Sequence, residues 1–529
     1  LATGAAHAPH QVPSEWIEHY RGRFDDGWEA SRDRAVDRQR ATGIIPADTV
    51  VPDRPPWIDV WDELPSEHRR LFARFQEVFA GFLTHLDHQL GRFLDGLERM
   101  GLADDTVVVL ASDNGASAEG GRHGSRNEHR FGFGLPDSIE DSLEAIDELG
   151  GFRAYNHYPW GWAWAGNAPL RLWRRYTWLG GSRTPLIVRA PGRIPDPGAV
   201  RGQFTHVVDL FPTILELCGV EAPDEVDGVA QQRIDGTSLV PTFDDPVGEV
   251  RTTQYFEMMV SRSIYHDGWK ATTDHVPSGV RDEEELLTGS RDLEAPNWAL
   301  FDLRTDFAEA VDVGAEHPEV LDDLAARWHA EAEANGVYPL IDALQGRVSA
   351  MEPPTWPIPP TVELWPGFGP IADEAVPSLA SGSPLTVEVD VPDDGGEGVL
   401  CAMGDWNNGW ALVVLAGHLA FLLDVASRGF RVDSDRRLPA GTHTLGFRFA
   451  RRGTGADGGP EGVLTLDGEE WARGPLPQGL GTGGIQIGGG GLRLGHDTGF
   501  PVSDDYRPPF PWTGALHRVV FGNLPPTRR

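Results

Sequence analysis

Residues 106–121, TVVVLASDNGASAEGG, decide the fold. The run from Thr106 to Ala111 is β-branched and aliphatic with polar residues on both sides, which is typical of a strand buried on both faces of a parallel sheet. Asp113 and Asn114 follow where this strand ends. Ligands of open α/β sheets bind beyond the carboxyl ends of the strands, so a carboxylate beside an amide oxygen is well placed for a hard cation. Taken alone, Asp-Asn-Gly is ordinary turn chemistry, and this stretch by itself favours a plain turn.

The composition limits the number of domains and the kinds of partner. The chain has 529 residues, more than one hydrophobic core usually holds, so we expect at least two domains. Acidic residues outnumber basic ones by 80 to 45, for a net charge of -35. This charge argues against a nucleic-acid partner or an anionic-membrane surface, and an anionic substrate would need a local pocket of positive groups.

Cysteines and apolar runs bear on the compartment. Cys218 in an expected helix and Cys401 in an expected strand do not make a disulfide framework, and we expect both thiols to be packed. No apolar run is long enough to span a bilayer. The chain opens at Leu1 with LATGAAHAPHQVP, which is typical of the middle of a domain and indicates that the true N-terminus is missing. The compartment therefore stays unknown, with the cytoplasm favoured because there is no disulfide framework.

The first 350 residues show the pattern of an α/β domain. Apolar residues recur at spacings of three and four from Leu71 to Met100, which predicts a long amphipathic helix leading directly into the strand at Thr106. This helix-then-strand order is typical of a doubly wound sheet, and Leu186 to Ala190 predicts a second buried strand. Alternation over residues 262–273 and 298–303 predicts a smaller antiparallel sheet towards the end of the domain.

The rest of the chain has a different composition. We expect a proline-rich linker over residues 351–375 between a domain of residues 1–350 and a second domain of residues 376–529. Short alternating or apolar runs separated by Gly, Asp, Asn and Pro in the second domain predict an antiparallel β-sandwich. We interpret LGTGGIQIGGGG, residues 480–491, as a glycine-rich turn rather than a nucleotide loop, because no βαβ unit surrounds it.

Several separate stretches, in family order along the chain, resemble the arylsulfatases, which are type I sulfatases of the alkaline phosphatase superfamily. They are HAPHQVP at 7–13, EHYRGRFDDGW at 18–28, SDNGASAEGG at 112–121, NAPLRLWRRYTWLGGSRTPLIV at 167–188, THVVDLFPTILEL at 205–217 and ALFDLRTDFAEAVDV at 299–313. The resemblance covers nearly all of residues 1–345 and implies part of an alkaline-phosphatase-like doubly wound sheet with a small antiparallel C-terminal subdomain. Residues 380–525 are similar to the concanavalin-like sandwich of some long bacterial arylsulfatases.

The resemblance implies a particular chemistry. It calls for a divalent cation, calcium with magnesium as the alternative, a formylglycine nucleophile made from Cys or Ser, and positive groups around the sulfate. By motif match, Asp113 and Asn114 would be two of the metal ligands. His7 matches the family histidine that hydrogen-bonds the sulfate and can assist the leaving group as an acid. Arg174 falls where relatives place a lysine that bridges sulfate and nucleophile; arginine keeps the charge but is longer and planar.

Other basic residues receive no catalytic role. Lys270, the only lysine in the chain, falls by family resemblance on a strand of the small sheet, and we interpret it as structural. His10, His123 and His157 lie near the expected cleft in sequence, and we assign them no function.

The chain lacks the family's nucleophile motif, C-x-P-x-R or S-x-P-x-R. Cys218 is followed by GVEA and Cys401 by AMGD. The resemblance places this motif, and the pair of aspartates of the family's first strand, before Leu1. Calcium binds six to eight oxygens, so one carboxylate and one amide leave it under-coordinated. We therefore expect an incomplete arylsulfatase that neither holds its metal well nor turns over sulfate esters by itself.

Two alternatives stay open beside a sulfatase acting on a small sulfate ester. One is a phosphoester or phosphonate hydrolase of the same superfamily, because sulfate and phosphate esters use similar cation-anchored sites. The other is a non-catalytic protein that contacts glycans through the C-terminal sandwich. Comparing turnover of an aryl sulfate and an aryl phosphate distinguishes the phosphoester hydrolase from the sulfatase. Glycan binding by the sandwich alone would favour the non-catalytic protein.

Overall fold

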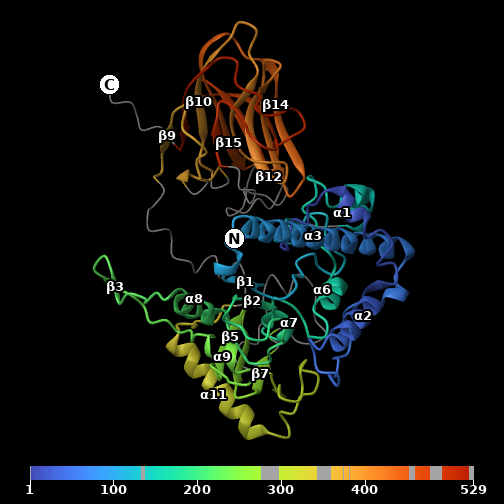
Figure 1. Ribbon diagram of the computed structural model, residues 1–529. Helices are drawn as coiled ribbons and strands as arrows, with labels where there is room; N and C mark the ends of the chain where they lie inside the picture. Colours follow the sequence, from blue (N-terminus) through green and yellow to red (C-terminus); the bar gives the residue numbers. More distant parts are fainter. Residues whose placement is uncertain are drawn as a thin grey trace. The chain divides into compact units, whose positions relative to one another are not determined.

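The structure is a computed structural model that describes residues 2–132, 138–273, 275, 297–341, 359–372, 375–379, 382–451, 459–476 and 491–522. The chain divides into two compact units, one built mainly from residues before Met351 and the other from Glu352 onward (Figure 1). Residues 480–490 of the glycine-rich run and residues 351–358 of the predicted linker lie outside the described residues. Among the helices that are described, none is both long and apolar enough to cross a lipid bilayer.

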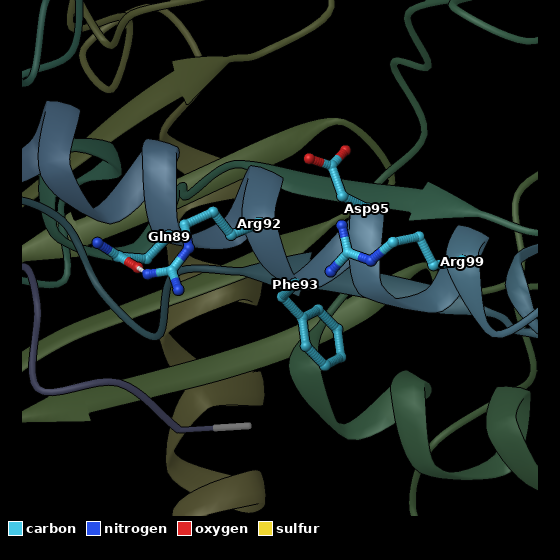
Figure 2. Close-up of a pocket in the computed structure, with 5 residues that line it drawn as sticks. All are labelled: Gln89, Arg92, Phe93, Asp95 and Arg99. Carbon is cyan, nitrogen blue, oxygen red and sulfur yellow. Dashed lines mark hydrogen bonds between the residues drawn. The ribbon is translucent and has the colours of Figure 1, made fainter.

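The longest helix of the first unit is α3 (Ser66–Arg99), which confirms the helix predicted from the apolar spacing. Its first half lies in the core, where Leu71, Phe75 and Val78 are each 0% exposed. Its second half leaves the core, and Phe93 is 47% exposed. A shallow pocket of about 370 Å³ lies along this second half (Figure 2). The residues that line it are Gln89, Arg92, Phe93, Asp95 and Arg99.

Two strands follow the predicted positions but not the predicted environment. β1 (Val108–Ala111) pairs antiparallel with β2 (Leu186–Arg189), and Val109 lies opposite Val188. Among the described strands no other pairs with either of them. Leu110 is 46% exposed and Ile187 58%. The prediction of strands buried in a parallel, doubly wound sheet is therefore wrong for these residues, because the neighbouring strands and helices that would bury them are not among the described residues.

Several helices and a tryptophan cluster form the main core of the first unit. α1 (Ser14–Glu18), α2 (Gly27–Ala41) and α6 (Trp160–Gly166) pack with the first half of α3. Trp162 and Trp164 of α6 are buried in this core. The remaining short elements are η1 (Trp61–Glu63), η2 (Ala103–Asp105), α4 (His129–Gly132), α5 (Ile139–Glu144), η3 (Ile146–Glu148), α7 (Leu179–Ser182), η4 (Val207–Asp209), α8 (Leu210–Cys218), β3 (Glu225–Val226), β4 (Val229–Ala230) and α9 (Pro241–Asp244).

The small antiparallel sheet is confirmed. It runs in the order β5 (Thr253–Met258), β6 (Ser261–His266), β7 (Trp269–Thr273) and β8 (Trp298–Asp302). The helix α11 (Pro318–Ala334) packs on it, and Trp328 of this helix shares a buried cluster with Ile264 and Leu300 of the sheet. A mixed α/β first unit therefore ends in a separate antiparallel layer.

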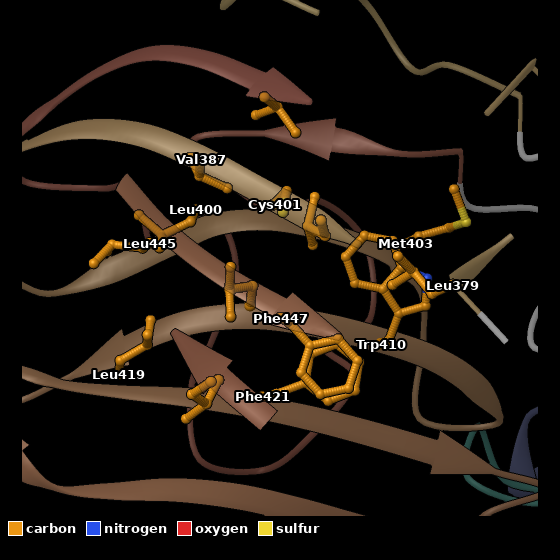
Figure 3. Close-up of a cluster of buried hydrophobic side chains, with 14 of the residues drawn as sticks. Leu379, Val387, Leu400, Cys401, Met403, Trp410, Leu419, Phe421, Leu445 and Phe447 are labelled. Carbon is orange, nitrogen blue, oxygen red and sulfur yellow. The ribbon is translucent and has the colours of Figure 1, made fainter. Parts of the chain in front are cut away.

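The second unit consists of antiparallel strands in two sheets. The first sheet has the order β17-β16-β15-β10-β19-β9 and the second β14-β13-β12-β11-β18. The strands are β9 (Val362–Leu364), β10 (Leu385–Val391), β11 (Gly398–Gly404), β12 (Asn408–Leu415), β13 (His418–Val425), β14 (Gly429–Arg437), β15 (Gly441–Arg451), β16 (Pro460–Leu466), β17 (Glu469–Pro475), β18 (Arg493–Leu494) and β19 (Ala515–Phe521). Inward side chains of both sheets form one hydrophobic cluster (Figure 3). At its centre Phe421 stacks on Phe447, with ring centroids 3.5 Å apart.

Two predictions about single segments need correction. β9 falls inside the predicted linker but pairs with β19, so Val362 to Leu364 belong to the second unit because their backbone extends its sheet. Cys401 is buried in β11 as expected, whereas Cys218 is exposed because it ends α8 at the surface. The expectation of a packed thiol at Cys218 is therefore wrong.

Candidate active site

The loop that follows β1, residues 112–121, is held against the segment 167–181 by backbone contacts. The Gly115 amide donates to the carbonyl of Gly181 at 3.1 Å, and the Arg174 amide donates to the carbonyl of Ala116 at 3.1 Å. The Ala116 amide donates to Asn167 Oδ1 at 3.0 Å. A Cβ at Gly115 would lie 1.7 Å from the Gly180 carbonyl oxygen, so only glycine permits this approach.

An ion pair joins the two segments. Arg174 Nε donates to Glu119 Oε1 at 2.7 Å, and Arg174 Nη2 lies 2.6 Å from the same oxygen. Glu119 Oε2 accepts from the Ala118 amide at 3.0 Å and from the Ser117 hydroxyl. The side chains of Arg174 and Glu119 are 25% and 32% exposed, so a small solute can reach the pair.

His157 lies behind this ion pair and is fully buried. Its Nε2 lies 2.8 Å from Ser117 Oγ, and its Nδ1 lies 2.9 Å from the Tyr158 carbonyl oxygen. A carbonyl only accepts, so Nδ1 carries the ring hydrogen of a neutral His157. Burial lowers the pKa of His157 to about 4; Glu119 and the Tyr158 carbonyl oppose this shift, and Arg174 and His7 add to it. The imidazole is therefore neutral at pH 7.

Two further buried histidines, His10 and His129, are also held neutral. His10 is 1% exposed and its ring centroid lies 5.1 Å from that of His157. Burial lowers the pKa of His10 well below its usual value, and His157 and His7 act in the same direction. Burial lowers the pKa of His129 to about 4, with a smaller effect of His7. His7 itself is exposed, with Nδ1 2.8 Å from the Ala8 carbonyl oxygen.

Glu128 is a buried acid beside the ion pair, with 9% of its surface exposed. Burial raises the pKa of Glu128 to about 8; the charge of Glu119 adds to the rise and Arg174 opposes it. Its carboxyl group is therefore mainly protonated at neutral pH, as a neutral donor rather than a second anion.

The four residues matched to the family motif lie in two kinds of surroundings. Arg174 lies against the loop after β1 through its contacts with Ala116 and Glu119, and His7 lies at the surface with its Nδ1 at the Ala8 carbonyl. Asp113 is exposed and Asn114 is half-buried at the end of β1. In the part of the chain that is described, no group of three or more His, Cys, Asp or Glu side chains could hold a metal ion. Because calcium takes six to eight oxygens and magnesium six, the described residues do not fit a complete site for either.

Sequence reasoning assigned no role to three residues that contact one another beside Arg174: Ser117, Glu119 and His157. Ser117 and Glu119 are in the quoted motif but carry no distinctive spacing, and their partners lie 40 and 55 residues away. Lys270, in contrast, has the structural role expected of it. Its Nζ donates to Glu309 Oε1 at 2.5 Å and to the Thr177 carbonyl at 2.8 Å, and the group is buried.

Comparison with known proteins identifies two family matches. Residues 1–220 match the family described as Sulfatase, and residues 172–332 match N-sulphoglucosamine sulphohydrolase, C-terminal. An uncharacterized sulfatase of Schizosaccharomyces pombe is 30% identical over 345 residues, which cover 63% of this chain and 57% of that protein. The arylsulfatase of Klebsiella aerogenes is 30% identical over 224 residues, 42% of this chain and 46% of the enzyme. The chain thus spans about half the length of the curated relatives it matches.

Among solved structures, the crystal structure of Ps i-CgsB is similar to part of the chain. It superposes with a TM-score of 0.38 and 16% identity, over 66% of this chain and 52% of that chain. A superposition this weak supports no conclusion about function.

Proposed function

Since residues 1–332 belong to the type I sulfatases of the alkaline phosphatase superfamily, we propose that the chain is part of an enzyme that hydrolyses sulfate esters, of the arylsulfatase kind, to an alcohol or phenol plus inorganic sulfate. The observation that carries the proposal is the contact of Arg174 with the loop after β1, where its amide donates to the Ala116 carbonyl and its guanidinium pairs with Glu119. Arg174, matched to a sulfate-binding position, thus lies against the same loop that carries Asp113 and Asn114.

In this proposal the two residues have different tasks. Arg174 supplies guanidinium N–H groups, which match the fork of two sulfate oxygens. His7 directs Nδ1 at the Ala8 carbonyl, so its other nitrogen, Nε2, is left to act on the ester. As an imidazolium, Nε2–H would donate to the bridging oxygen and give the leaving alcohol or phenol its proton. Asp113 and Asn114 would be two ligands of the divalent cation. Its remaining oxygen ligands, and the nucleophile, would come from polypeptide outside residues 1–529.

Exposed apolar residues support the proposal that this chain is an incomplete sulfatase domain. Leu110 and Ile187 of the β1–β2 pair are 46% and 58% exposed, and Phe211 and Ile214 of α8 are 56% and 45% exposed. Large apolar side chains exposed together on a strand pair or on one helix often mark a contact with further polypeptide. Strands composed like β1 and β2 are normally buried on both faces, so a covering layer of further strands and helices is the occupant we propose.

We also propose that the second unit is a concanavalin-like sandwich that serves as an accessory, glycan-contacting domain. Its two antiparallel sheets with one common core support the architecture. Binding of sulfated glycans to the full chain, lost in a chain cut after residue 350, would support the contact; equal binding by both would contradict it.

The experiment that tests the enzymatic proposal starts from the DNA immediately upstream of the codon for Leu1. An in-frame extension with a C-x-P-x-R or S-x-P-x-R motif is expected, and the extended protein should hydrolyse an aryl sulfate faster than the matched aryl phosphate. Preference for the phosphate would make the enzyme a phosphoester hydrolase instead. A stop codon followed by a genuine start at this position would leave a protein without a nucleophile and would overturn the proposed activity.

A further inference from the structure

The anion-binding arginine of the candidate site is already paired with an internal anion. Both Arg174 Nε and Nη2 contact Glu119 Oε1, at 2.7 and 2.6 Å. Glu119 is fixed in turn, because its Oε2 accepts from the Ala118 amide at 3.0 Å and from Ser117. The carboxylate therefore cannot swing away from Arg174 without losing these four contacts, and the pair presents a net charge close to zero to an incoming ester.

The neighbouring ionisable groups do not restore a positive charge. His157 and His129 are neutral at pH 7 because burial lowers the pKa of each to about 4. His10 is buried and also neutral. Glu128 adds no second negative charge, since burial raises its pKa to about 8. None of these buried groups therefore offsets Arg174, and the carboxylate of Glu119 is the charge that does.

This arrangement distinguishes anions by their charge. A sulfate monoester carries one negative charge, whereas a phosphate monoester carries close to two above pH 7, since its second pKa is about 6. The repulsion from a fixed carboxylate is proportional to the ligand's charge, so Glu119 disfavours the phosphate ester more strongly. Resting on the proposed function above, we propose that Glu119 is a specificity-determining residue that makes the Arg174 site select singly charged sulfate esters over doubly charged phosphate esters.

The test compares two small anions on the full 529-residue chain. Methyl sulfate and methyl phosphate would be titrated at pH 7.5 by calorimetry, on the wild-type chain and on Glu119→Gln, which keeps the shape of the side chain. Removing the carboxylate strengthens binding of both anions, and the gain is larger for the doubly charged methyl phosphate because the interaction scales with the ligand's charge. We expect the ratio to shift by about tenfold towards methyl phosphate, which corresponds to one ion-pair-sized change in charge interaction.

A matched control is Glu148→Gln, which removes the carboxylate of another arginine pair, 2.8 Å from Arg126, outside the loop 112–121. It should leave both affinities unchanged, and circular dichroism should show that each variant is folded. Equal gains in affinity for the two anions in Glu119→Gln, or no gain, would overturn the proposed role of Glu119. The proposed role of Arg174 as an anion site would not be affected. Absence of binding of either anion to both the wild-type chain and Glu119→Gln would remove Arg174 as an anion site, and the inference would fall together with its role in the proposed function.

Discussion

Lys270 and Glu309 form the most deeply buried ion pair described in the first unit, and its loss should be costly. The lysine and glutamate side chains are 2% and 0% exposed. Glu309 Oε1 accepts from Lys270 at 2.5 Å and Oε2 accepts from the Leu179 amide at 2.7 Å. In Lys270→Met the carboxylate would stay buried with that amide as its remaining described partner. Breaking a buried pair on one side costs about 3–5 kcal/mol, because the remaining charge is uncompensated.

Differential scanning calorimetry of the whole chain would measure this loss. For a unit of this size about 1 kcal/mol lowers the melting temperature by about 2–4 °C, so we expect the transition of the first unit to move down by about 10 °C. The transition of the second unit should not move. In the double variant Lys270→Met/Glu309→Gln the amide oxygen still accepts from Leu179 without a net charge, and more than half of the shift should be recovered.

The outcome of the double variant tests the reasoning. If it melts as low as Lys270→Met, the loss comes from packing of the lysine stem and the argument from the buried charge is wrong. A shift of under about 3 °C in the single variant would also refute it, since that corresponds to only about 1 kcal/mol. Arg201→Met serves as the control, because Arg201 pairs with Asp196 at the surface and its removal should leave both transitions in place.

Three further predictions concern the candidate site and the strands beside it. The folded pKa of Glu128 is raised to about 8 from 4.5, so the stability it contributes is present at low pH and is lost as pH rises towards 8; the free energy of unfolding in urea should fall between pH 5 and 8 in the wild type and much less in Glu128→Gln. Gly115→Ala should destabilise the first unit by about 2 kcal/mol or more, as measured by urea unfolding, since the new methyl group would meet the Gly180 carbonyl. Ile187→Asp should change the stability of residues 1–529 by under about 0.5 kcal/mol, because the side chain is 58% exposed, but should strongly destabilise the extended protein in the same urea assay. A large loss from Ile187→Asp in residues 1–529 would contradict the absence of a covering layer.

Local patterns predicted the elements better than their surroundings. The spacing of apolar residues was enough to locate α3, because a helix face repeats within a few residues. The aliphatic runs of β1 and β2 also located strands, yet they could not specify what packs on them. Burial depends on partners far away in the sequence or outside it. A run such as VVVL indicates that a strand needs two covering layers, not that residues 1–529 supply them.

The same limit applies to the candidate site. His7 and Arg174 could be predicted because each sits in a motif that resembles a family pattern. Ser117, Glu119 and His157 could not, because hydrogen bonds between residues 40 to 55 positions apart leave no periodic trace in the sequence. Their importance becomes visible only when the loop after β1 is seen against the segment 167–181.

Two features at β1 point to missing polypeptide: an exposed side chain on the strand and an incomplete set of cation ligands in the loop after it. Among the described residues no further strand covers Leu110, and the loop at the end of β1 supplies one carboxylate and one amide where a divalent cation needs about six oxygens. In an open α/β sheet these features have a common origin, since the ligands at a strand's carboxyl end come largely from the neighbouring strands. One absent set of strands would therefore account for both features. A protein adapted to work without those strands would be expected to carry polar residues at Leu110 and Ile187, and its retention of exposed aliphatic side chains there favours an incomplete enzyme over a non-catalytic relative.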